Sequence, residues 1–119
     1  MALFRFRIRS PERDRETDAG RLQRLQQSLV DIRVEMERER AGLRDRYERI
    51  AADAAFSLQR MEDGRAGGGV SLKINDMTDA MIRYTSRLAS LQTQIDFVTE
   101  VGQQVAAFSQ DYEGDKAVA

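Results

Sequence analysis

Carboxylate pairs are the residues of this 119-residue chain that come closest to a catalytic or metal-binding pattern. Asp76 with Asp79, and Glu35 with Glu39, are spaced so that each pair would share one face of a helix. Paired carboxylates can carry acid–base catalysis or bind a metal ion. The chain has no histidine and no cysteine to complete such a site. We interpret the pairs as solvated charge, and we predict no catalytic residue, no metal ligand and no enzyme activity.

A glycine cluster is the second feature that could suggest chemistry. Residues 64–69 read Gly-Arg-Ala-Gly-Gly-Gly, and Lys73 follows shortly after. The spacing of a phosphate-binding loop, Gly-x-x-x-x-Gly-Lys-Ser/Thr, is absent, so we predict no nucleotide and no other cofactor. Glycine this dense does not sustain a helix, and it indicates a turn. Val70, Leu72 and Ile74 then alternate with polar residues, which extends the predicted Gly-rich turn, with a short strand signal, over residues 64–74.

Two long helices must flank this turn, because apolar residues recur at steps of three and four on both sides of it. Ser10 suits an N-cap and Pro11 the first helical position, so the first helix is predicted over residues 11–63. Asn75 is a second N-cap candidate and starts a helix predicted over residues 75–112, followed by a flexible tail over 113–119. The residues predicted to form the interhelical seam are Leu43, Tyr47, Ile50, Leu58, Met77, Met81, Tyr84, Leu88, Leu91 and Ile95.

The two stripes also predict which residues face each other. In an antiparallel hairpin with an eleven-residue turn over 64–74, Tyr47 would face Leu91, and Leu43 would face Ile95. The charged stretch over residues 33–49 interrupts the first stripe. Arg40 falls where a seam residue is due, opposite Val98, and we expect loose packing or a partner there.

The N-terminal residues 1–10 carry a different period. Phe4, Phe6 and Ile8 alternate with arginines, which is typical of a half-buried strand, so we predict a β-like interaction arm. Pairing with another strand, in the same chain or across an interface, is the favoured role. Contact with a membrane surface or a nucleic acid is the alternative.

Composition narrows the class of partner. One third of the residues are charged, yet the net charge is −1, which indicates solvated helix faces and argues against nucleic-acid binding. The apolar runs are too short to span a bilayer and no secretory signal is evident, so we expect a cytoplasmic protein without membrane insertion.

A two-helix hairpin buries little apolar surface, and further apolar residues lie off the seam. They are Val30, Val34, Ala51, Ala55, Phe56, Ile82, Ala89, Phe97 and Val101.

The opening Met-Ala-Leu-Phe-Arg-Phe-Arg-Ile, followed by a helix rich in Arg, Glu and Gln, resembles the start of the flagellar and type III export stalk family. That family forms an antiparallel coiled coil in the central hole of an export ATPase. The resemblance covers about the first 45 residues and implies a role in a secretion or motility apparatus, as stalk, chaperone or filament-like subunit.

The sequence therefore predicts an all-α protein: a long antiparallel two-helix coiled-coil hairpin with a short N-terminal β-like arm, which assembles into a helical bundle. We expect a non-enzymatic structural or adaptor protein. Its partners would be proteins, either further copies of itself or subunits of a larger complex. A subunit of a flagellar or type III secretion apparatus is the alternative.

Overall fold

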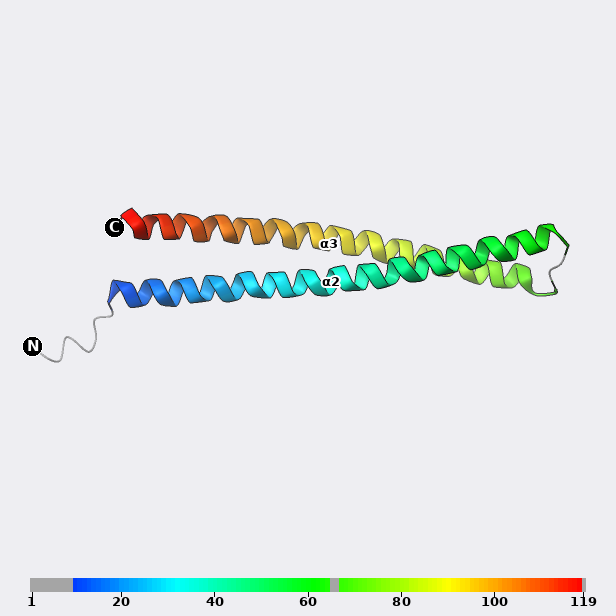
Figure 1. Cartoon of the computed structure of the whole chain (residues 1–119), viewed down its shortest axis with the longest axis horizontal. Coiled ribbons are helices and arrows are strands. Elements are labelled where there is room, and N and C mark those ends of the chain that lie inside the picture. Colours follow the sequence, from blue (N-terminus) through cyan, green and yellow to red (C-terminus); the bar gives the residue numbers. More distant parts are fainter. Residues whose placement is uncertain (1–9, 65–66, 119) are drawn as a thin grey trace, which may run out of the picture. The chain divides into compact units, whose positions relative to one another are not determined.

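The computed structural model describes residues 10–64 and 67–118, and nearly all of them are helical. Helix α2 spans Pro11–Glu62 and helix α3 spans Val70–Val118 (Figure 1). These described residues contain no strand. The predicted all-α helical hairpin is confirmed, while the predicted arm with Phe4, Phe6 and Ile8 lies outside the described residues.

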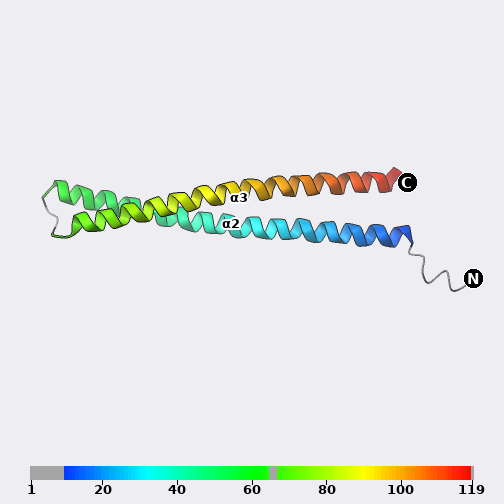
Figure 2. The same ribbon diagram turned by 180° about the vertical axis from the view of Figure 1, so that it is seen from behind.

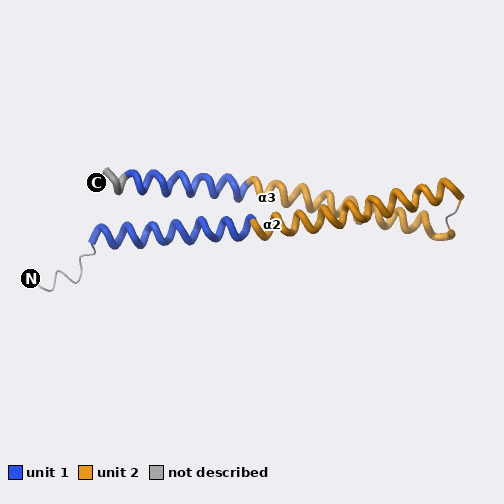
Figure 3. Tube along the Cα trace, viewed as in Figure 1, with its two compact units in different colours: residues 1–33, 97–119 blue, residues 34–96 orange. Residues whose placement is uncertain are grey.

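The chain divides into two compact units, and both helices contribute to each (Figure 3). Unit 1 comprises residues 1–33 and 97–119, and unit 2 comprises residues 34–96. Within unit 2, the end of α2 leads through the turn into the start of α3, and the two ribbons cross in projection when viewed from either side (Figures 1 and 2). Within unit 1, the start of α2 runs antiparallel to the end of α3.

The start of α2 follows the prediction from local chemistry. The Ser10 hydroxyl accepts a hydrogen bond from the backbone N–H of Arg13 at 3.1 Å, as an N-cap does. The Ser10 carbonyl accepts the N–H of Asp14 at 3.2 Å, so the helical ladder begins here. Pro11, whose missing N–H would have no helical partner anyway, takes the first position.

The turn between the helices is shorter than the sequence pattern predicted. The Gly64 N–H donates to the carbonyl of Met61 at 3.2 Å, and Gly64 has a φ of 69°, a left-handed conformation that ends α2. Gly69 has a φ of 87°, and its carbonyl accepts the N–H of Lys73 at 3.1 Å, so α3 starts directly after it. A turn of this kind needs glycine at both positions, because L side chains rarely adopt these angles.

The predicted boundaries of the second helix are wrong at both ends. Residues 70–74 form the first turn of α3 rather than a strand-like extension of the turn. Val70 and Ile74 are half-buried while Leu72 is 70% exposed, because Val70, Ile74 and Met77 continue the three-and-four spacing of a helix. At the other end, α3 continues to Val118 rather than ending at residue 112.

The seam of unit 2 is thin. Among the described residues, Leu91 at 0% exposure and Ile95 at 5% are the only buried apolar side chains. The half-buried members of the predicted seam are Leu43, Tyr47, Ile50, Met77, Met81, Tyr84 and Leu88. Leu58 is the exception, since it is 47% exposed and Ser57 is buried in its place at 7%. The seam steps from Ala54 to Ser57, which places a small side chain between the helices near the turn.

The helices of unit 2 also meet in a different register from the predicted one. Tyr47 lines a groove with Met81 and Thr85 rather than with Leu91. The Arg40 guanidinium donates to the Gln92 side-chain oxygen at 2.6 Å rather than facing Val98. The displacement is six residues for Arg40, which contacts Gln92 instead of Val98, and twelve for Asp53, which pairs with Lys73 instead of Thr85. It follows from the turn, because starting α3 five residues earlier slides its residues past α2.

Paired cysteines, added to a chain that has none of its own, test this register. Asp53→Cys with Lys73→Cys replaces two side chains whose charged atoms lie 3.8 Å apart, and a short bismaleimide should link them within one polypeptide. Asp53→Cys with Thr85→Cys is the pair that the sequence-predicted register would join. It should stay unlinked, because Thr85 lies about 18 Å further along α3 than Lys73. Efficient linking of the second pair alone would overturn the observed register.

Truncating Leu91 measures how much the seam contributes to stability. Leu91→Ala should lower the free energy of unfolding by about 2–5 kcal/mol, since it removes the one fully buried apolar side chain of the described residues. The matched control is Leu72→Ala on the same helix, where the 70% exposed side chain should change it by less than about 0.5 kcal/mol. Urea unfolding at one fixed protein concentration compares the two, and equal effects would contradict the assigned seam.

Candidate functional site: two unlike flanks of unit 2

One flank of unit 2 is charged, and its charges pair across the two helices. The charged flank consists of Glu39 and Asp53 from α2 with Lys73 and Arg87 from α3. Arg87 donates from Nε to Glu39 Oε2 at 2.7 Å and from Nη2 to Oε1 at 3.1 Å. Asp53 and Lys73 form a looser ion pair at 3.8 Å. Two-point pairing of a guanidinium with a carboxylate fixes orientation, although exposed pairs contribute little to stability.

The Glu39–Arg87 pair changes the acidity of both groups. Hydrogen bonds from Arg87 lower the pKa of Glu39, partial desolvation opposes that shift, and the positive charge of Arg87 adds to it. The hydrogen bonds and charge of Glu39 raise the pKa of Arg87 in turn. Both groups are therefore held in their charged forms at neutral pH.

On the opposite flank a stretch of each helix carries no charge, and Arg44 and Glu48 line a groove beside it with Thr85 and Leu88. We define the uncharged flank by its members, which follow helical spacing on each helix: Ala51, Ala55 and Leu58 from α2, and Thr78, Ile82, Thr85 and Ala89 from α3. Leu58 is 47% exposed and Ile82 is 62% exposed. A shallow groove lined by Tyr47, Met81 and Ile82, together with the two threonines and Ser86, marks where the helices meet on this side.

The threonines of this flank are less polar toward solvent than their type suggests. The Thr78 hydroxyl donates to the Ile74 carbonyl at 2.9 Å, and the Thr85 hydroxyl donates to the Met81 carbonyl at 2.8 Å. Bonding back to the preceding turn satisfies the hydroxyl within its own helix. The uncharged flank thus offers methyl groups and small side chains, a surface on which another helix can pack closely.

Unit 1 has its own apolar surface. The Tyr112 hydroxyl donates to Asp18 Oδ2 at 3.2 Å across the two helices. Burial, with additional hydrogen bonding to Asp18, raises the pKa of Tyr112, so the phenol stays neutral. Beside this bond, Leu22 and Phe108 line a shallow notch with Asp18, Arg21 and Tyr112. Other exposed apolar side chains of unit 1 are Leu25, Val30, Ile32 and Phe97.

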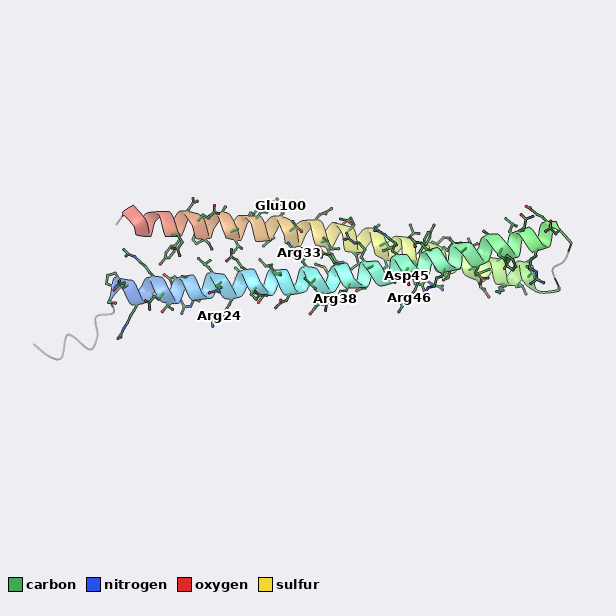
Figure 4. All side chains as sticks on the ribbon, in the orientation of Figure 1. Arg24, Arg33, Arg38, Asp45, Arg46 and Glu100 are labelled. Carbon is green, nitrogen blue, oxygen red and sulfur yellow. The ribbon has the colours of Figure 1, made fainter. Side chains whose placement is uncertain are left out.

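The remaining candidates from the sequence are charged and exposed. Asp45 and Arg49, four residues apart, form an ion pair within α2 at 2.7 Å. Figure 4 shows Arg38 on the side of α2 that is turned away from α3. Glu39, a candidate metal ligand, is engaged by Arg87 instead. Across residues 10–64 and 67–118, no group of three or more acidic side chains is placed to hold a metal ion.

The predicted seam residues, Leu58 excepted, lie between the helices and hold the hairpin together. They are therefore structural in this chain. The sequence pattern places Ala51, Ala55, Ile82 and Ala89 off the seam, but it does not show that they share one flank. The signal that could have shown the shared flank is the pair Thr78 and Thr85. A sequence pattern counts both as polar, although their hydroxyls donate to backbone carbonyls of the same helix.

Comparison with protein families, curated proteins and solved structures finds no significant match to the chain. The resemblance to the export stalk family stays a prediction. Neither α2 nor α3, over the residues that the structure describes, combines the length and apolarity needed to cross a membrane. A cytoplasmic location also stays a prediction.

Acid titration tests the Glu39–Arg87 pair. In the wild-type chain, the Glu39 carboxyl should titrate below the ordinary glutamate range by carboxyl-detected NMR, and Arg87→Gln should return it toward that range. Because the folded-state pKa is lowered, the stabilisation from this pair is present at neutral pH and is lost as pH falls through that pKa. An unchanged Glu39 midpoint in Arg87→Gln would contradict the pairing.

Proposed function

We propose that this chain is a non-enzymatic structural or adaptor protein that presents helix faces to other helices. The observation that carries the proposal is that large apolar side chains remain exposed on regular helix faces in both units. Ile82 and Leu58 do so in unit 2, and Phe97 and Phe108 in unit 1. Single exposed apolar residues are common on protein surfaces, but rows at helical spacing are typical of surfaces that bind other helices.

The kind of partner follows from the shape of these surfaces. In unit 2 the members of the uncharged flank are three and four residues apart on each helix, and in unit 1 Leu25 and Ile32 are seven apart and Phe97 and Phe108 eleven apart. These separations are close to whole numbers of helical turns, so they suit the ridges and grooves of another helix. The uncharged flank adds small residues, which allow two helix backbones to approach. A helical protein, either a second copy or a subunit of a larger complex, is therefore the partner that the surface suits best.

Site-specific photo-cross-linking in native cells tests this function. A photoreactive side chain at Phe97 or Phe108 should form adducts with one or a few defined helical proteins, because these exposed positions would face the partner. Gln103 and Gln110, exposed polar residues on another face of the same helix, are the matched controls and should give few adducts. Equal labelling at all four positions, or none at any, would contradict the proposal.

A further inference from the structure

Helix α2 carries a second stripe at coiled-coil spacing, beside the seam. We define the flank stripe as Arg44, Glu48, Ala51, Ala55, Leu58 and Glu62, which follow each other at steps of four and three residues. It extends the uncharged flank of α2 in both directions and lies wholly within unit 2. Ala51 is half-buried and the other five residues are exposed.

The order of residues in the flank stripe is self-complementary when read in opposite directions. Two copies running antiparallel, with their centre between Ala51 and Ala55, would bring Ala51 of one against Ala55 of the other. The same placement brings Arg44 against Glu62 of the second copy, and it does so twice because a two-fold interface repeats every contact. Glu48 then lies against Leu58, which its methylene stem can cover.

We propose that the flank stripe binds the flank stripe of a second copy in antiparallel orientation. Alanines at the centre allow the helices to approach closely, and opposite charges at both ends set the register. Arg44 and Glu62 are about 27 Å apart along one helix, so they cannot pair within one chain. The uncharged flank of α3, with its exposed Ile82 and inward-bonded threonine hydroxyls, would line the sides of the same interface.

Charge complementarity identifies the second copy as the occupant. The charged flank already pairs its charges within the chain, as Glu39 with Arg87 and Asp53 with Lys73. In the flank stripe, Arg44 has Glu48 one turn away, while Glu62 at the other end has no cation among the members of the stripe. Another copy of the same stripe supplies the matching arrangement. This inference rests on the proposed function, and it names the partner and the surface.

Charge reversal tests the inference by sedimentation-equilibrium measurement of the dimer dissociation constant. Arg44→Glu places two carboxylates against each other at both ends of the interface, and Glu62→Arg places two cations there. Each variant alone should weaken the dimer roughly tenfold or more, because two attractive pairs become repulsive. The double variant Arg44→Glu/Glu62→Arg should recover the wild-type constant. An equimolar mixture of the two single variants should form a heterodimer at least as tight as the wild type.

Controls separate the interface from a general loss of folding. Arg83→Glu, an exposed reversal on α3 away from the flank stripe, should leave the dissociation constant unchanged. Ala55→Leu should weaken the dimer by forcing the helices apart, while circular dichroism shows α2 and α3 intact. A monomeric wild type at 0.1 mM (about the highest practical concentration for this measurement), or single reversals without rescue in the mixture, would overturn the inference. Photo-cross-links from Phe97 to a different protein would still support the proposed function, so the two failures are distinguishable.

Discussion

The length of the turn between Gly64 and Gly69 is the constraint on which the rest of unit 2 depends. Both glycines have positive φ angles, so one ends α2 and the other starts α3 at a defined residue. A connection of only seven residues between Glu62 and Val70 limits how far the two helices can slide past each other. The register that brings Tyr47 beside Thr85, and Arg87 beside Glu39, is a consequence of these two backbone positions.

That register in turn sorts the surface of unit 2 into unlike flanks. Moving α3 by six residues would separate the Glu39–Arg87 and Asp53–Lys73 pairs and leave four charges without these partners. In the observed register, the charges of one side are satisfied within the chain. The other side is left with alanines, threonines, Leu58 and Ile82. The uncharged stretch of this side can gain from association, because desolvating it breaks neither ion pair of the charged flank.

Much of this fold could be predicted from sequence because long heptad stripes are strong signals. The spacing of Met77, Met81, Tyr84, Leu88 and Leu91 predicts a helix and its buried face correctly. Register could not be predicted in the same way, since two stripes of equal period align equally well at every heptad shift. The register depends on residues 70–74. Their alternation is typical of a strand when it is read alone, but α3 starts directly after Gly69, so these five residues form its first turn.

The uncharged flank was harder to recognise because a sequence reports residue types and not where their polar atoms point. Hydropathy scales count Thr78 and Thr85 as polar, yet each hydroxyl donates a hydrogen bond to the backbone carbonyl one turn earlier. Between them Ile82 stays 62% exposed. Ser57 is also polar by residue type, and it is buried at the seam in place of Leu58, the residue that the sequence predicts there. Small hydroxyl residues therefore serve both surfaces of unit 2: inside, they let α2 and α3 approach, and outside, they present methyl groups to a further helix. A hairpin with so thin a seam can thus carry a second, outward-facing packing surface without the large apolar patch that would make it aggregate.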